Sequence, residues 1–192
     1  GSVGVSPARP PDHDGWYNHP LSVRWFATDL LAGIASCTSL TYGAPDESGG
    51  RLVGSCTDRA GNTSATFPFA LRYDQAPPVV TSLALHPLDG AVAAKWRVTG
   101  ASSVTLTRSR GTATADSSEV YSGAGDALTD HKVENYVRYR YTLTASDEAG
   151  NEVRRIAYVT PLPVLYAPRP GARLGVHARP LLAWRPARKA RY

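Results

Sequence analysis

The two cysteines are the residues of this 192-residue chain whose chemistry is easiest to predict. Cys37 and Cys56 each lie in a stretch where apolar and polar residues alternate, as they do in a β-strand. We therefore expect a disulfide between neighbouring strands, closing a loop of about twenty residues, stabilising the fold by about 3 kcal/mol and persisting in oxidising compartments. Two buried reduced thiols are the alternative. No CxxC pair and no histidine at ligand spacing supports a zinc site.

Four side chains with oxygen donors lie near the ends of the expected strands: Asp14, Asp29, Asp58 and Asn62. Because Ca²⁺ binds about six to eight oxygen atoms, these residues are candidate calcium ligands. Asp and Asn in turns also hydrogen-bond the backbone nearby, which accounts for the same residues without an ion. We expect no other cofactor.

The remaining polar residues do not form a catalytic pattern. The five histidines are scattered through expected turns, and the chain has no GxSxG, HExxH, GxGxxG or phosphate-loop motif. These observations predict a protein that is not an enzyme. Trp16 and Tyr17 lie in a loop, where their rings are candidates for stacking on a sugar.

The net charge of +5 is unevenly distributed. All 16 acidic residues lie at or before Glu152, whereas seven basic residues lie from Arg169 onward. We interpret the basic tail as the solvated face of an unfinished module rather than as a site for an anionic polymer, and expect no specific nucleic-acid binding. No stretch approaches the roughly 20 apolar residues of a membrane-spanning helix, so we expect no membrane insertion.

The elements that position these residues are predicted to be strands throughout. Alternation is clearest in residues 65–73 and 139–145, where aromatic and aliphatic residues occupy every second position. Together with the strands that contain these two runs, the predicted strands are 3–6, 21–28, 34–41, 51–58, 63–73, 79–86, 92–98, 104–108, 119–121, 137–146 and 152–159.

An internal repeat defines the length of the module. Thr57-Asp-Arg-Ala-Gly-Asn62 recurs as Ser146-Asp-Glu-Ala-Gly-Asn151, 89 positions later. Each copy lies between two alternating runs and has the Asp, Gly and Asn of a hairpin turn. An offset of this size matches one β-sandwich module.

Tryptophans and prolines support the same division. Trp25, Trp96 and Trp184 each lie in a short run that follows a proline or glycine break, which indicates three modules. We expect Trp25, Trp96, Tyr139 and Tyr141 to be structural core residues. The segments 73–78 and 160–163 are rich in proline and are expected to be stiff linkers.

Residues 79–161 resemble a fibronectin type III module. The resemblance rests on Trp96, on Val120-Tyr-Ser-Gly123 followed by Thr129-Asp130, and on the run from Tyr139 to Asn151. It implies that Tyr139 is a tyrosine corner, whose hydroxyl bonds the backbone a few residues upstream.

Residues 13–74 resemble a bacterial immunoglobulin-like repeat, through Asp14-Gly-Trp-Tyr-Asn18, Ala27-Thr-Asp29 with Gly33-Ile34, the cysteine pair and the run from Asp58 to Asn62. Residues 164–192 resemble the first strands of another fibronectin type III-like module. The predicted fold is therefore all-β, with tandem antiparallel β-sandwiches and an incomplete third sandwich. The expected domains are residues 1–75, 76–162 and 163–192.

These resemblances imply a non-catalytic structural or adhesive protein, a spacer or stalk, located outside the cell or on its surface. The expected partner is an extracellular protein or a glycan. We expect that the third module is truncated, and the alternative is that another chain or segment completes its sheet. The alternative is a carbohydrate- or cell-wall-binding accessory module of a secreted hydrolase.

Overall fold

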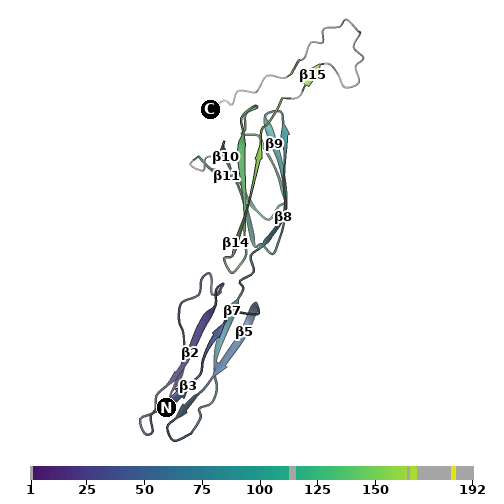
Figure 1. The fold of residues 1–192 in the computed structure, drawn as a ribbon. Helices are drawn as coiled ribbons and strands as arrows, with labels where there is room; N and C mark the ends of the chain where they lie inside the picture. The colour runs from purple at the N-terminus through teal and green to yellow at the C-terminus, as the bar shows by residue number, and fades with distance from the viewer. Residues whose placement is uncertain (1, 113–115, 164, 168–182, 185–192) are drawn as a thin grey trace. The chain divides into compact units, whose positions relative to one another are not determined.

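The computed structural model describes residues 2–112, 116–163, 165–167 and 183–184. Within these ranges the regular elements are all β-strands, and each pair of neighbouring strands is antiparallel (Figure 1). The predicted all-β fold class is therefore confirmed. Over the same residues, the structure contains no helix long and apolar enough to cross a membrane.

Contacts divide the chain into two compact units. The first contains Gly1–Pro77 together with Asp147–Asn151, and the second contains Pro78–Ser146 together with Glu152–Tyr192. The change from one unit to the next along the chain falls at a proline pair, where φ is restricted and a backbone donor is missing.

The first unit contains seven short strands. They are β1 (Val3–Pro7), β2 (Leu21–Ala27), β3 (Ile34–Cys37), β4 (Ser39–Tyr42), β5 (Glu47–Gly54), β6 (Cys56–Asp58) and β7 (Phe67–Tyr73). Strands β1, β2 and β4 form one sheet in the order β1-β2-β4, whereas β3 pairs with β6 and β5 pairs with β7.

Two strands that the sequence predicts to be continuous are each broken in the middle. The predicted strand 34–41 is divided at Thr38 and the predicted strand 51–58 at Ser55. At these positions the chain changes its pairing partner, from β6 to β2 in one case and from β7 to β3 in the other. The Thr38 amide donates to the Ser55 carbonyl (2.9 Å), and the Ser55 amide donates to the Thr38 hydroxyl (3.1 Å). The two breaks therefore lie opposite each other, and hydrogen bonds still join them.

Alternation along β2 builds the core of the first unit. Leu21, Val23 and Trp25 are buried, whereas Ser22 and Arg24 face solvent. The buried set comprises Tyr17, Leu21, Val23, Trp25, Cys56, Leu71 and Tyr73. The predicted strand 63–73 begins only at Phe67, because the segment before it bonds to Cys56 through Ser64.

The second unit is a sandwich of two sheets. Its strands are β8 (Val79–Leu88), β9 (Ala91–Thr99), β10 (Ser103–Arg110), β11 (Ser118–Gly123), β12 (Ala127–Asp130), β13 (Tyr139–Ser146) and β14 (Glu152–Val159). One sheet has the order β11-β10-β13-β14 and the other has the order β12-β9-β8. Strand β12 was not predicted, because its four residues contain one buried side chain and that side chain is an aspartate.

The core of the second unit lies between these two sheets. Strand β13 buries Tyr139, Tyr141, Leu143 and Ala145 on its inner face, with perfect alternation along its eight residues. The buried set comprises Val92, Ala94, Trp96, Val104, Leu106, Val133, Tyr139, Tyr141, Leu143, Ala145 and Val159. Each unit therefore has a hydrophobic core of its own.

Beyond residue 163 the structure describes only two short strands. Strand β15 (Leu165–Ala167) pairs with β16 (Ala183–Trp184) in an antiparallel arrangement. The rest of the expected third sandwich lies outside the described residues, as does most of the basic tail.

Candidate functional site

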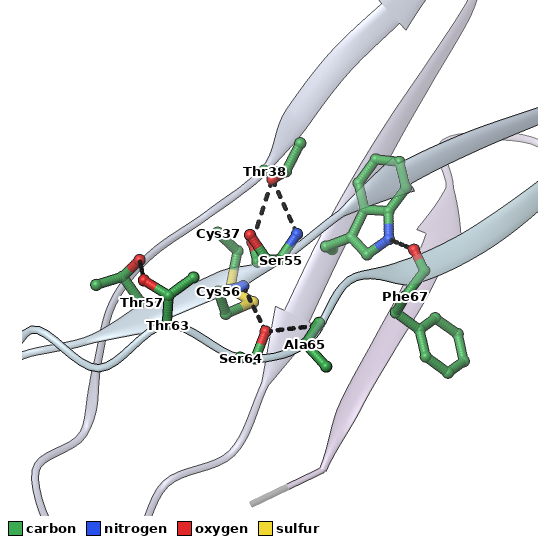
Figure 2. The surroundings of a disulfide bond; sticks show 10 residues. Cys37, Thr38, Ser55, Cys56, Thr57, Thr63, Ser64, Ala65 and Phe67 are labelled. Carbon is green, nitrogen blue, oxygen red and sulfur yellow. Dashed lines mark hydrogen bonds between the residues drawn. A yellow bond between two sulfur atoms is a disulfide. The ribbon is translucent and has the colours of Figure 1, made fainter.

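The disulfide joins two strands that are already hydrogen-bonded neighbours. Cys37 on β3 lies directly opposite Cys56 on β6, and the two sulfur atoms are bonded, which confirms the predicted cross-strand bridge (Figure 2). The Cys56 amide donates to the Ser64 hydroxyl (3.0 Å), and the Ser64 amide donates to the Cys56 carbonyl (2.9 Å). The bridge therefore reinforces the pairing next to the point where both strands change partners.

The two aromatic residues proposed for sugar stacking are buried. Trp16 is 8% exposed and Tyr17 is 4% exposed. The Arg72 guanidinium lies 4.2 Å from the centroid of the Trp16 ring, and the Tyr17 amide donates to the Arg72 carbonyl (2.9 Å). Stacking on a sugar requires exposed rings, and these two rings are buried because the loop is folded against the end of β7. No local sequence pattern reveals this long-range contact.

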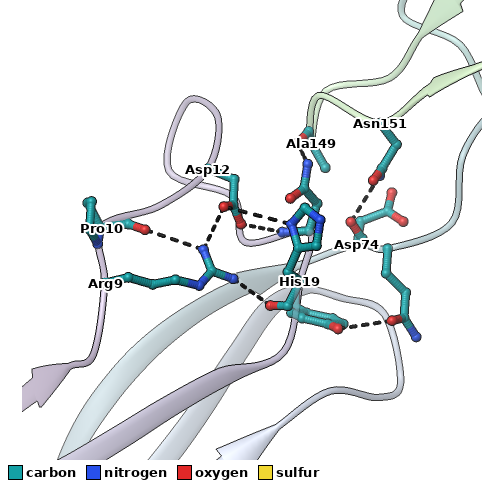
Figure 3. Close-up of polar contacts among 10 residues, drawn as sticks. Arg9, Pro10, Asp12, His19, Asp74, Ala149 and Asn151 are labelled. Atoms are coloured by element: carbon teal, nitrogen blue, oxygen red, sulfur yellow. Dashed lines mark hydrogen bonds and ion pairs between the residues drawn. The ribbon is translucent and has the colours of Figure 1, made fainter.

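Polar contacts also stabilise the loop that contains Trp16 and Tyr17 (Figure 3). The Arg9 guanidinium lies 2.6 Å from the Asp12 carboxylate and donates to the His19 carbonyl (2.6 Å). The other oxygen of Asp12 accepts a hydrogen bond from the Asn18 amide (2.9 Å). Burial acts to raise the pKa of the Asp12 carboxyl, but the hydrogen bonds from Arg9 and Asn18 lower this pKa below its ordinary value overall. These contacts stabilise the loop, and both oxygens of the Asp12 carboxylate interact with groups of the loop itself.

Two hydrogen bonds from asparagine to aspartate are found in both copies of the repeated turn, and the first copy has a third from Ala60. Asp58 Oδ1 accepts from the amides of Ala60 (2.9 Å) and Asn62 (2.8 Å), and Oδ2 accepts from the Asn62 side-chain amide (2.8 Å). Gly61 has a φ of 90°, a left-handed conformation that favours glycine. The hydrogen bonds from Asn62, the side-chain bond first, lower the pKa of the Asp58 carboxyl.

In the second copy, the Asn151 amide donates to Asp147 Oδ1 (2.9 Å) and its side-chain amide donates to Oδ2 (2.9 Å). Gly150 has a φ of 81°. The motif therefore encodes a self-contained turn in which the aspartate oxygens are hydrogen-bond acceptors.

The four candidate calcium ligands are only partly brought together. Asp58 and Asn62 meet within the turn, whereas Asp29 Oδ1 accepts from the Leu31 amide (2.8 Å) and the Asp14 side chain is 87% exposed. In the part of the chain that the structure describes, no group of three or more His, Cys, Asp and Glu side chains is arranged to hold a metal ion. The oxygens of Asp58 are instead used by donors of its own turn.

Sequence reasoning missed a buried polar cluster in the second unit. Asp130 at the end of β12 is 5% exposed, and its Oδ2 lies 2.5 Å from the Arg108 guanidinium. The same oxygen accepts a hydrogen bond from the Tyr141 hydroxyl (2.8 Å), and Oδ1 accepts from the Lys132 amide (2.9 Å). Burial first, and then the Asp130 charge, raise the pKa of Tyr141 above its ordinary range. The cluster links β12 in one sheet to β10 and β13 in the other.

The expected core residues lie inside the two units. Trp25, Trp96, Tyr139 and Tyr141 are each at most 3% exposed. The Tyr139 hydroxyl accepts a hydrogen bond from the Glu134 amide (3.0 Å), five residues upstream, which is the geometry of a tyrosine corner. The Trp96 indole donates to the Gly125 carbonyl (3.0 Å). These polar contacts satisfy the donors and acceptors that burial of large aromatic rings leaves inside the protein.

Comparison with known proteins finds distant structural similarity. No protein-family model matches the chain, and no curated protein matches it by sequence. The FN1–FN3 domains of chicken CNTN1 are similar with a TM-score of 0.44 and 12% identity, over 80% of this chain and 67% of theirs. A chain of a cytokine receptor complex is similar with a TM-score of 0.42 and 18% identity, over 83% of this chain and 96% of its own. Both similarities are distant, and neither identifies a ligand or an activity of this chain.

Proposed function

We propose that this chain is a non-catalytic extracellular module, a spacer or adhesive segment of a secreted or surface protein. The observation that carries the proposal is the presence of two units, each with its own core, one of them crosslinked by a disulfide between paired strands. A protein that transmits force or holds a distance needs independent cores and resistance to unfolding, and a disulfide persists outside the reducing cytosol.

Within this proposal, residues 1–75 form a bacterial immunoglobulin-like domain and residues 76–162 form a fibronectin type III-like domain. Residues 163–192 form the N-terminal part of a further fibronectin type III-like domain. The partner is an extracellular protein or a glycan.

The linker provides the test of the spacer role. Spin labels carried on unnatural amino acids at the exposed positions Arg51 and Arg97 leave the disulfide intact. A stiff spacer gives a narrow distribution of distances between the labels, measured by pulsed electron paramagnetic resonance. Replacing Pro77 and Pro78 with glycine is expected to broaden that distribution. An equally broad distribution in both proteins contradicts the spacer role.

A further inference from the structure

The chain contains two Asp–Gly pairs, Asp14–Gly15 and Asp89–Gly90. In such a pair the glycine amide nitrogen can attack the carboxyl carbon of the aspartate side chain, because glycine has no side chain that obstructs the approach. The product is a cyclic succinimide, which water opens to aspartate or to isoaspartate. The reaction requires that the fold leave both the carboxyl group and the glycine amide free, and the two pairs differ in this respect.

Asp14 and Gly15 are the central residues of a two-residue turn between His13 and Trp16. Asp14 has a φ of 41° and Gly15 a φ of 85°, and positive values at both positions are typical of a type I′ hairpin turn. The Trp16 amide donates to the His13 carbonyl (2.7 Å), and the His13 amide donates to the Trp16 carbonyl (3.3 Å). The hydrogen bonds that close the turn therefore do not use the nitrogen of Gly15.

Both reacting groups of this first pair face solvent. The Asp14 side chain is 87% exposed, and His13 Nδ1 lies 3.8 Å from its Oδ2, beyond hydrogen-bond distance. A Cβ atom built on Gly15 would meet no atom within 4 Å. Within the described residues, the Gly15 amide donates no hydrogen bond. The Asp14 side chain can therefore turn toward this nitrogen without breaking a hydrogen bond.

In the second pair, the side chain of Asn135 holds both reacting groups. Asn135 is 6% exposed, and its Nδ2 donates to Asp89 Oδ1 (2.8 Å). The Gly90 amide donates to Asn135 Oδ1 (2.9 Å). Both hydrogen bonds must open before the Gly90 nitrogen can reach the carboxyl carbon. The second pair is therefore a protected copy of the same dipeptide within the same chain.

We propose that Asp14–Gly15 is a site of spontaneous modification, at which the folded chain forms isoaspartate while Asp89–Gly90 is protected. The Gly15 nitrogen forms a bond to Asp14 Cγ, and the bond from Cγ to one carboxyl oxygen breaks. That oxygen leaves as water, with the amide hydrogen and the proton of the carboxyl group. A solvent water then breaks the bond between the Gly15 nitrogen and the main-chain carbonyl carbon of Asp14. Its oxygen enters the new α-carboxyl group, and the nitrogen regains a hydrogen.

Isoaspartate changes the turn that precedes Trp16. The main chain then runs through the side chain of Asp14, which adds a methylene group to the turn. Because the geometry of a hairpin turn depends on its length, we expect the hydrogen bonds between His13 and Trp16 to weaken. The Trp16 ring, which is 8% exposed in the unmodified chain, is then expected to become more exposed.

Ageing of the folded full chain in buffer at physiological pH and temperature tests the proposal. Peptide mapping by mass spectrometry with electron-transfer fragmentation distinguishes isoaspartate from aspartate at each pair. We expect isoaspartate to accumulate about tenfold faster at Asp14 than at Asp89, because two hydrogen bonds must open first at Asp89. In concentrated urea the fold no longer protects Asp89, and the two pairs are expected to react at similar rates.

Matched variants give a second readout. Asp14→Asn and Asp89→Asn each place asparagine before glycine, so that succinimide formation releases ammonia and its hydrolysis leaves a mass gain in the intact protein. We expect this gain to appear about tenfold faster in Asp14→Asn than in Asp89→Asn while the chain is folded. Asp14→Glu is expected to abolish the reaction at the first pair, because the longer side chain cannot form a succinimide. Circular dichroism checks that each variant is folded.

Absence of isoaspartate at Asp14, or equal rates at the two pairs in the folded chain, would overturn the proposal. The same tenfold difference in urea would also overturn it, because the neighbouring residues and not the fold would then be the cause. The NMR signal of the Trp16 indole is expected to shift in the separated isoaspartate form. An unchanged signal would contradict the expected loosening of the turn.

Discussion

At the scale of single residues, Asp130 is the polar group on which the second core depends. It is almost fully buried, and it accepts hydrogen bonds from the Arg108 guanidinium, the Tyr141 hydroxyl and the Lys132 amide. A buried carboxylate with this many donors is stable in the interior. Without it, the Arg108 guanidinium would be a costly uncompensated charge and the Tyr141 hydroxyl would lack its hydrogen-bond acceptor.

Replacing Asp130 with alanine tests this dependence. The variant leaves the largely buried Arg108 side chain, which is 13% exposed, without its counter-charge, so we expect the free energy of unfolding of the second unit to fall by about 3–5 kcal/mol. Urea titration followed by circular dichroism measures the change. Glu152→Ala is the control, because it removes the partner of the exposed Arg154 and is expected to cost at most about 1 kcal/mol. Equal effects of the two substitutions contradict the role of Asp130.

Alkaline pH tests the environment of Tyr141. Burial, followed by the Asp130 charge, raises the pKa of Tyr141 in the folded state, so the phenol ionises more easily in the unfolded chain. Its contribution to stability is complete below the ordinary tyrosine pKa of about 10 and is lost as the pH rises above that value. We expect Tyr141→Phe to reduce the fall in the free energy of unfolding of the second unit above this pH. The comparison requires urea titrations of both proteins at several pH values, and identical slopes would exclude Tyr141 as the cause.

Gly54 packs closely against the Trp25 ring, and this packing leaves no room for a larger residue at position 54. A Cβ atom built on Gly54 would lie within 3.0 Å of three atoms of the Trp25 ring, which is buried and also donates its indole N–H to the Phe67 carbonyl. We expect Gly54→Ala to destabilise the first unit by about 1–3 kcal/mol through overpacking. Gly49→Ala is the matched control, because a Cβ there meets no atom within 4 Å. Thermal unfolding of both variants distinguishes a local clash with Trp25 from a general sensitivity of β5 to replacement of its glycines.

At the scale of elements, the first unit depends on strands that change their partners. Strands β3 and β4 follow each other along the chain but belong to different sheets, and the same is true of β5 and β6. Short strands of three or four residues form few ladder hydrogen bonds, and they need other interactions to stay paired. The disulfide supplies one such interaction between β3 and β6.

Removal of the disulfide measures that contribution. The cysteines are 19 residues apart, and we expect the double variant Cys37→Ser, Cys56→Ser to lose about 3 kcal/mol of stability in the first unit. The second unit contains no cysteine and is expected to keep its own transition temperature. Calorimetry in the presence of a reductant on the unaltered chain should reproduce the effect. An equal loss in both units would show that their cores are coupled.

At the scale of the whole molecule, two separate cores predict two unfolding transitions in calorimetry. Calcium provides the accompanying test. Because donors of its own turn already occupy the Asp58 oxygens, we expect neither transition to move between a chelator and about 5 mM calcium, which exceeds the dissociation constants of weak extracellular sites. A rise of several degrees in the first transition would establish calcium binding.

Local patterns of the sequence predicted a large part of the fold and a smaller part of the candidate site. Alternation in β2 and β13 placed Trp25 and Tyr141 in the cores, because side-chain direction in a strand depends only on position along it. Burial of Trp16 depends on β7, about fifty residues away in the chain, and no pattern around Trp16 records that contact.

The sequence by itself predicted the all-β class, the turns at Asp58 and Asp147 and the pairing of the two cysteines. The first two follow from periodicity and side-chain chemistry within a few residues. The strands that flank the turn at Asp147 form a hairpin, whereas those that flank the turn at Asp58 pair with other strands, β3 and β5. Only the tertiary structure decided where Thr38 and Ser55 divide their strands and why Asp130 is buried. The physical reason is that strand pairing and burial are made between segments far apart in the chain, and alternation is compatible with many partners.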